Sequence, residues 1–280
     1  MKRTLLTISA VLALAACQRE HATTPATPAN ATAARTGATL ITNEWALPTP
    51  DGAAQPDLTS GPDGRLILSW VRPMGDRNAL QYAAYMGDEN WESAPKTIAV
   101  GRTLTANWAN TPHITMTEDG ALWAHWLQTP ADPASPHASD IMLTRSPDNG
   151  VHWSPPIAVN TDDTGTEHGF VALWPAAPGA VGIAWLDGRK TAGATHTHDA
   201  NVKDHKHEEG AAGEMTVRGA RFDGYLQRSN DAEIDASTCD CCGTDAALTD
   251  LGPLLVYRDR TKDEIRDEAP KRLRPSSVLG

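Results

Sequence analysis

The fold is decided by two stretches of equal length, PDLTSGPDGRLILSW at residues 56–70 and PHITMTEDGALWAHW at residues 112–126. Each holds an Asp-Gly pair at the same offset between two apolar runs, which predicts two strands joined by a tight turn. A third copy, ALWPAAPGAVGIAWLD, contains Trp185, and a fourth, AALTDLGPLLVYRD, contains Tyr257. The chain therefore repeats one structural unit along its length.

The spacing of the copies gives the size of this unit. Their aromatic residues, Trp70, Trp126, Trp185 and Tyr257, lie 56, 59 and 72 residues apart. Weaker strand pairs, LQYAAYMGDENWESAPKTIAV and IMLTRSPDNGVHWSPPIAV, fill the first two intervals. Four strands per repeat, with almost no helical periodicity, are typical of a propeller blade. We predict an all-β fold, a β-propeller of four-stranded blades, over residues 40–267.

The octapeptide SPDNGVHW, residues 146–153, falls between the third and fourth strands of the second unit. Asp148 is placed to accept hydrogen bonds from turn amides, Gly150 to supply a positive φ, and Trp153 to pack between sheets. With Ser146 these residues match the Asp-box, or BNR repeat, Ser-x-Asp-x-Gly-x-x-Trp. The chain thus resembles the sialidase-like (neuraminidase) β-propeller superfamily. That resemblance implies that the four Asp-box residues are structural and lie away from the catalytic face.

The same resemblance implies six blades, and the chain supplies about three and a half. Residues 268–280, EAPKRLRPSSVLG, form an atypical tail that abandons the strand pattern. Closure of the ring is what hides strand edges in this architecture. We therefore expect an incomplete propeller from a truncated or frame-shifted product. A small four-bladed propeller, or a ring completed by a second chain, is the alternative.

The N-terminus predicts where the protein is found. Residues 1–17 hold a short basic region, an apolar run at residues 5–14 and the sequence LAAC ending at Cys17. About ten apolar residues are too few to span a bilayer, so this is a signal peptide with a lipobox, and Cys17 is the lipidation site. Gln18 after the cysteine resembles the outer-membrane sorting pattern, with the protein facing the periplasm or the exterior. The Ala-, Thr- and Pro-rich residues 18–39 predict a disordered tether.

The charge of the chain limits its partners. The sequence has 24 basic and 35 acidic residues, a formal net charge of −11, and loss of Lys2 and Arg3 with the signal makes it −13. Such a surface argues against nucleic acid as a partner. We expect contact with the membrane only through the lipid anchor.

Two ligand-rich segments fall on the loops predicted to lie opposite the Asp-box turn. The segments HTHDANVKDHKHEE and STCDCCGT supply the candidate metal ligands His196, His198, His205, His207, Cys239, Cys241 and Cys242. Imidazole and thiolate together favour Zn or Cu over Mg or Ca. The alternatives are a solvated polar insertion for the first segment and, because three cysteines cannot all pair, one disulfide plus one thiol for the second.

Charged residues crowd the same predicted face. The segments WLDGR and YRDRTKDEIRD supply the candidate catalytic residues Asp187, Arg189, Tyr257, Arg258, Asp259 and Arg260. The resemblance implies three carboxylate-binding arginines, a tyrosine activated by a glutamate, and an aspartate acid/base. The Phe-Arg-Ile-Pro motif of sialidases does not occur in this sequence, so the first arginine has no counterpart. Solvated ion pairs are the alternative role for these arginines.

These observations favour a cell-envelope lipoprotein whose sialidase-like propeller has a non-hydrolytic, binding or metal-handling role with a carbohydrate or a metal ion as ligand. The alternative is an exo-sialidase-like glycoside hydrolase acting on sialic acid or a related acidic sugar, inactive in this chain.

Overall fold

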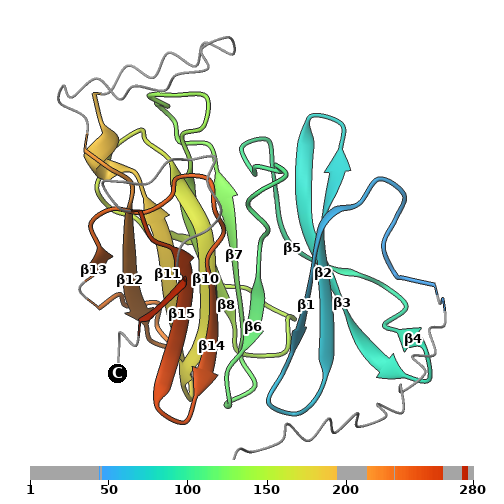
Figure 1. The fold of residues 1–280 in the computed structure, drawn as a ribbon. Coiled ribbons are helices and arrows are strands. Elements are labelled where there is room, and N and C mark those ends of the chain that lie inside the picture. The colour runs from blue at the N-terminus through green and yellow to red at the C-terminus, as the bar shows by residue number, and fades with distance from the viewer. Residues whose placement is uncertain (1–43, 45, 194–212, 230, 261–272, 277–280) are drawn as a thin grey trace, which may run out of the picture. The chain divides into compact units, whose positions relative to one another are not determined.

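The computed structural model describes residues 44, 46–193, 213–229, 231–260 and 273–276 (Figure 1). The chain divides into two units, Met1–Glu44 and Trp45–Gly280, and the described strands all lie in the second. Cys17, the tether at residues 18–39 and the four histidines between 196 and 207 lie outside the described residues. Among the described residues, no helix has the length and apolar character needed to cross a membrane.

The described chain is built from four antiparallel sheets. The first sheet contains β1 (Ala54–Ser60), β2 (Leu66–Met74), β3 (Arg77–Gly87) and β5 (Lys96–Gly101), with β4 (Asn90–Trp91) also paired to β3. The second contains β6 (Ile114–Met116), β7 (Leu122–Gln128), β8 (Asp140–Ser146) and β9 (Ile157–Ala158). The third contains β10 (His168–Ala177), β11 (Ala180–Asp187), β12 (Thr216–Phe222) and β13 (Ala232–Asp235), and the fourth contains β14 (Asp245–Thr249), β15 (Gly252–Arg258) and β16 (Leu273–Ser276). A 3₁₀ turn, η1 (Arg189–Thr191), follows β11.

The prediction of an all-β fold is confirmed. The four sequence copies form the hairpins β1–β2, β6–β7, β10–β11 and β14–β15, which are the first two strands of each sheet. Gly64, Gly120 and Gly179 adopt positive φ in the first three hairpin turns, a conformation that glycine takes without a steric penalty. Strand order follows chain order within the second, third and fourth sheets, as in a propeller blade. The number of blades in the ring stays a prediction.

The tail differs from its prediction. Leu273–Ser276 forms β16 and pairs antiparallel with β15, with Arg258 opposite Leu273. Four residues of the predicted atypical tail, residues 268–280, thus pair as a strand, and the frame-shifted origin of that tail stays a prediction. A free edge of β15 offers unpaired backbone groups that any extended segment can satisfy, whatever its side-chain pattern.

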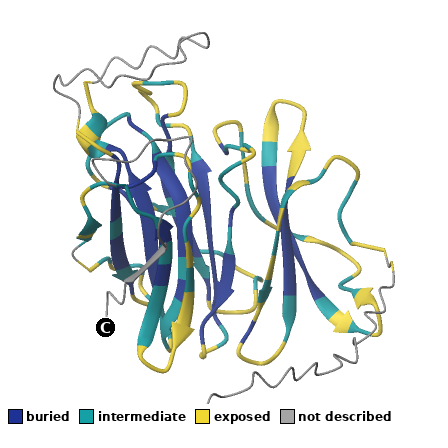
Figure 2. Ribbon diagram, viewed as in Figure 1, coloured by how far each residue is buried: buried dark blue, intermediate teal, exposed yellow. Residues whose placement is uncertain are grey.

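Apolar side chains between neighbouring sheets form the core. One cluster joins β2 and β3 to β6 and β7, a second joins β7 and β8 to β11 and β12, and a third joins β10, β11 and β12 to β15. The first strands of successive sheets also touch: β1 contacts β6, β6 contacts β10, and β10 contacts β14. Figure 2 shows burial concentrated in the middle of the strands and exposure at the turns. The loops at the ends of the sheets are therefore where polar side chains can gather.

The Asp-box turn is held by its own side chains. The hydroxyl of Ser146 donates to Asp148 Oδ1 and accepts from the N–H of Gly150, both at 2.8 Å. Asp148 Oδ1 also accepts from the N–H of His152 at 2.8 Å. These bonds satisfy the turn amides locally, so the turn needs no ligand to be ordered.

The same turn packs against the first sheet through Gly150 and Trp153. Gly150 has φ +79°, and an added Cβ there would overlap the hydroxyl of Tyr82. Tyr82 is buried, and its ring meets that of Trp153 edge-on, with centroids 6.2 Å apart. This geometry gives Trp153 a packing role.

Candidate functional site

The candidate site lies at the end of the third sheet where β10 begins and β11 ends. His168, the first residue of β10, is directly opposite Asp187, the last residue of β11. Ser139, just before β8, contributes to the same end, because its hydroxyl donates to the His168 carbonyl at 2.7 Å. The Asp-box turn follows the opposite end of β8, at Ser146. The segment between β13 and β14, with its cysteines, completes the site.

This cysteine segment is tied down at both of its ends. The N–H of Cys239 and the hydroxyl of Thr238 both donate to the Arg258 carbonyl, at 3.0 and 2.7 Å. At the other end, the hydroxyl of Thr244 donates to the carbonyl of Phe170 in β10. The thiols therefore stand on a backbone fixed to both the third and the fourth sheet.

The three thiols converge on one point. Cys239 Sγ lies 3.1 Å from Cys242 Sγ and 3.5 Å from Cys241 Sγ, and all three sulfur atoms lie within 4.8 Å of one another. These separations exceed the disulfide bond length of about 2.05 Å, so no disulfide joins these three sulfur atoms in the structure. Cys239 is buried, Cys242 is half-buried and Cys241 is exposed, so the group opens to solvent on one side.

The electrostatics distinguish the thiols. Burial raises the pKa of Cys239, but hydrogen bonds from the Cys241 amide and from the other two thiols, with the nearby Arg258 cation, outweigh it and lower that pKa. Burial and the Cys239 thiol raise the pKa of Cys241 to about 11. Arg258 also reaches Cys242, with Nη1 3.5 Å from Sγ. The Cys239 thiol, the most buried of the three, therefore ionises more readily than that of Cys241.

A buried ionic cluster lies beneath the same end of the sheet. Arg189 holds Asp187 with two hydrogen bonds, from Nε to Oδ1 and from Nη2 to Oδ2, both 2.7 Å long. Trp185 Nε1 adds a third bond to Oδ2 at 2.8 Å, and Asp187 is fully buried. Arg189 Nη2 also lies 3.3 Å from Asp231 Oδ2. The structure thus brings Asp187 and Arg189 together and engages both with other protein groups.

The remaining predicted catalytic residues each contact other parts of the protein. Tyr257 is buried against the third sheet, and its hydroxyl donates to Asp235 Oδ2 at 2.8 Å. Arg258 contacts Cys242 of the cysteine segment, and Asp259 forms a β-bridge with Thr238. Arg260 is half-buried at the end of the described stretch. A catalytic role for these residues stays a prediction.

Three further site residues were missed by the sequence analysis. Glu167 lies beside the cysteine segment, where burial and the charge of Asp240 raise its pKa to about 7. Asp162 and His168 belong to the buried cluster, with Asp162 Oδ1 3.1 Å from His168 Nε2. All three come from TDDTGTEHG, which has no motif spacing. Its density of polar residues directly before a buried strand was the one available signal.

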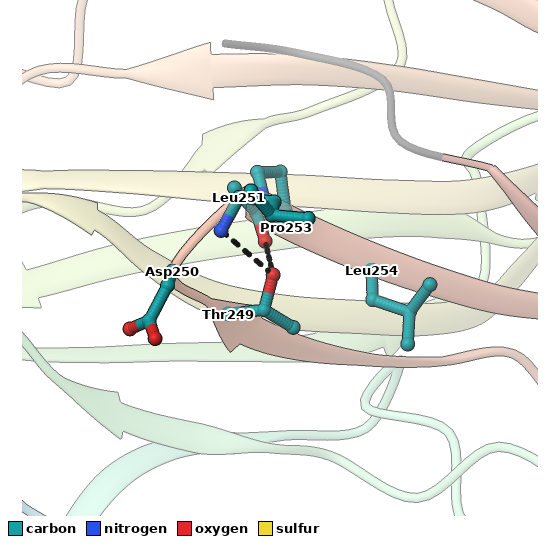
Figure 3. Close-up of a pocket in the computed structure, with 6 residues that line it drawn as sticks. Thr249, Asp250, Leu251, Pro253 and Leu254 are labelled. Carbon is teal, nitrogen blue, oxygen red and sulfur yellow. Dashed lines mark hydrogen bonds between the residues drawn. The ribbon is translucent and has the colours of Figure 1, made fainter. Parts of the chain in front are cut away.

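The pocket in Figure 3 is separate from this site. It surrounds the β14–β15 turn, where the hydroxyl of Thr249 donates to the Gly252 carbonyl at 2.7 Å and accepts from the Leu251 N–H at 3.2 Å. This turn precedes β15, whereas the cysteine segment contacts Arg258 at the far end of that strand. The pocket therefore adds no group to the candidate site.

Comparison with known proteins identifies the N-terminus. Residues 1–18 match the family described as the prokaryotic membrane lipoprotein lipid attachment site. The chain is a bacterial cell-envelope lipoprotein. No curated protein matches the sequence of this lipoprotein.

Solved structures with a similar fold include carbohydrate-active proteins. The lipoprotein is similar to the α-L-arabinanase of Penicillium chrysogenum, at 15% identity over 77% of this chain and 59% of that chain, with TM-score 0.45. It is also similar to an endo-arabinase of Bacteroides thetaiotaomicron, at 10% identity over 80% and 74% of the two chains, with TM-score 0.41. A PL25 ulvan lyase matches at 12% identity over 79% and 55%, with TM-score 0.44. The lipoprotein therefore spans about three fifths of the arabinanase chain.

Proposed function

We propose that this lipoprotein binds a soft late transition metal ion, Cu⁺ or Zn²⁺, through Cys239, Cys241 and Cys242. The observation that carries the proposal is the convergence of three cysteine sulfur atoms within 4.8 Å of one another. Thiolates are the ligands that Cu⁺ and Zn²⁺ prefer. Because Gln18 follows the lipidated cysteine, we place the protein at the outer membrane.

The sulfur separations suit such an ion after a small adjustment. Zn–S bonds of about 2.3 Å put two tetrahedral thiolate ligands about 3.8 Å apart. The observed 3.1 and 3.5 Å are somewhat shorter, so the sulfur atoms must move apart by a few tenths of an ångström to hold such an ion. Cys241 is exposed and Cys242 half-buried, so these two can move outward while Cys239 stays fixed by its backbone bond to Arg258.

The charges around the site govern how readily its sulfur atoms ionise. Cys239 ionises more readily than Cys241, and Arg258 stabilises anionic sulfur from one side. The carboxyl of Glu167, with its pKa near 7, is largely protonated below that pH and does not add to the negative charge there. Since metal binding displaces protons from thiols, the affinity should fall as the pH is lowered.

A disulfide between Cys239 and Cys242, with Cys241 left as a thiol, is the competing state in an oxidising compartment. The test uses the mature chain made soluble by Cys17→Ser, purified without an affinity tag under reducing conditions and reconstituted with Cu⁺. We expect about one Cu⁺ per chain, with Cu–S scattering in X-ray absorption. Cys239→Ser should abolish binding, and Ser237→Ala, in the same segment, should not change it.

Two results would overturn this proposal. One is substoichiometric copper in a chain whose three thiols all titrate with a thiol reagent. The other is undiminished copper in Cys239→Ser.

An exo-glycosidase acting on sialic acid or a related acidic sugar is the second candidate, and Glu167 is the observation that favours it. A carboxyl with pKa near 7 can act as a general acid at neutral pH. Against this role, Arg189 is already paired with Asp187, and Tyr257 is buried. A fluorogenic sialoside discriminates between the candidates, because turnover abolished by Glu167→Gln would favour the glycosidase.

A further inference from the structure

The buried cluster at the start of β10 contains an ion pair with poor hydrogen-bond geometry. His168 is fully buried, and the Asp162 side chain is 7% exposed. His168 Nε2 lies 3.1 Å from Asp162 Oδ1, yet neither atom makes a well-aligned hydrogen bond to any group in the part of the chain that the structure describes. Buried polar atoms are rarely left this way, because each pays its full desolvation cost.

The other ring nitrogen of His168 fixes what Nε2 can do. Nδ1 lies 2.9 Å from the Ser139 carbonyl oxygen, and since a carbonyl can only accept, Nδ1 carries a proton. In the neutral ring Nε2 then carries no proton, and its lone pair can accept a hydrogen bond or bind a metal ion. Metal-bound histidines commonly donate their second N–H to a backbone carbonyl in this way, which fixes the ring and raises its basicity.

The distances fit a shared cation. Two ligand atoms at about 2.0–2.1 Å from a tetrahedral Zn²⁺ lie about 3.3–3.4 Å apart, with the lone pair of each directed at the metal and not at the other ligand atom. The separations from Nε2, 3.1 Å to Asp162 Oδ1 and 3.8 Å to Asp187 Oδ2, bracket that value. All three atoms lie within 4.8 Å of one another. We propose that His168, Asp162 and Asp187 bind a divalent metal ion of the Zn²⁺ class, at a buried site separate from the thiols.

Carboxylates are the charged groups nearest to the His168 ring. Nε2 lies 3.1 Å from Asp162 Oδ1 and 3.8 Å from Asp187 Oδ2. Arg189 and Arg218 join these carboxylates to that of Asp231, which the Arg228 cation also influences. Arg189 Nη2 lies 3.6 Å from Asp162 Oδ1, so it approaches this carboxylate without hydrogen-bonding to that oxygen.

Asp187 is the weakest of the three ligands. Its Oδ2 already accepts from Trp185 and Arg189, so a metal must share this oxygen with them. Asp162 Oδ1 and His168 Nε2 are therefore the primary ligands. A metal held by these two would link the loop before β10 to the start of β10, and a shared bond to Asp187 would extend that link to the end of β11.

The competing occupant of the site is a proton on Nε2. Burial lowers the pKa of His168, but the carboxylates of Asp162 and Asp187, together with the Ser139 carbonyl, outweigh it and raise that pKa. These carboxylates attract a proton and a metal ion alike. The experiment must therefore determine which of the two is bound to Nε2.

The test uses a background variant in which the thiols and the sequence-predicted histidines cannot bind metal. In this variant Cys17, Cys239, Cys241 and Cys242 are replaced by Ser, and His196, His198, His205 and His207 by Gln. The probe is Zn²⁺ alone, followed by calorimetry and by elemental analysis after dialysis. We expect about one Zn²⁺ per chain. Adding Asp162→Asn should weaken the affinity at least about tenfold, whereas Asp163→Asn, the same change at the exposed neighbouring residue, should not.

Nitrogen NMR of the His168 ring gives a readout that a purely structural ion pair would not produce. Zn²⁺ should move the Nε2 resonance to the metal-bound range while Nδ1 stays protonated. The proposal is overturned if the folded background variant binds no Zn²⁺, if Asp162→Asn binds it equally well, or if Nε2 stays protonated in saturating Zn²⁺. Because this background has no thiols, its failure leaves the cysteine site standing, and failure of the cysteine site leaves this one standing.

Discussion

Replacing Gly150 by alanine should destabilise the packing between the first two sheets. The residue has φ +79°, and an L-residue in this left-handed region costs about 1–2 kcal/mol. The new methyl group would also overlap the buried hydroxyl of Tyr82, and overpacking of this kind costs typically about 1–3 kcal/mol. The sum is about 2–5 kcal/mol. At about 2–4 °C per kcal/mol for a domain of this size, a loss of about 3 kcal/mol lowers Tm by about 6–12 °C.

Gly120→Ala is the matched control for the backbone contribution. Gly120 has φ +80°, nearly the value of Gly150, but an added Cβ there meets no atom within 4 Å. It should therefore show the conformational cost alone. The double variant Gly150→Ala with Tyr82→Phe removes the hydroxyl that is struck, and Tyr82 Oη has no hydrogen-bond partner among the described residues. This second change should recover most of the difference between Gly150→Ala and Gly120→Ala.

Urea and thermal unfolding followed by circular dichroism measure these differences on the soluble chain. The double-mutant cycle isolates the steric contribution, provided that Tyr82→Phe alone is measured as well. Equal losses for Gly150→Ala and Gly120→Ala, within about 0.5 kcal/mol, would refute the packing role assigned to the Asp-box turn.

Three other changes have defined outcomes. Cys17→Ser should release soluble protein from the membrane fraction, and identical fractionation of variant and wild type would contradict lipid anchoring. Since the pKa of Glu167 is raised from 4.5 to about 7, its contribution to stability is full below about pH 4.5 and is lost as the pH rises through 7. In urea unfolding, the free energy of unfolding of the wild type should therefore fall between pH 5 and pH 8, and that of Glu167→Gln should fall less. Equal dependence on pH in the two proteins would refute the raised pKa of Glu167. A fluorogenic sialoside should show no turnover with this chain, because the Phe-Arg-Ile-Pro motif does not occur in it; turnover that disappears with Arg258→Ala or Tyr257→Phe would reverse that expectation.

The sequence by itself determined the features that depend on nearby residues. Apolar alternation around Asp-Gly turns specified the hairpins, because a tight turn and its two strands are set by a few adjacent residues. The lipobox specified the anchor, since a signal peptide is recognised as a linear segment. The turn after β8 was predictable for the same reason, because Ser146, Asp148 and Gly150 satisfy one another's hydrogen bonds within five residues.

Only the tertiary structure decided which polar groups meet. Asp162, His168 and Asp187 come from a loop and from the ends of two strands, and the register that sets His168 opposite Asp187 brings them together. Glu167 acquires its raised pKa from burial and from Asp240, which is remote from it in the sequence. The sequence made the Arg189 guanidinium a candidate to bind a substrate carboxylate, but in the folded chain it forms ion pairs with Asp187 and Asp231. Local patterns record the alternation of strands and turns, whereas burial and charge depend on contacts between residues far apart in the chain, and those contacts form only when the sheets pack.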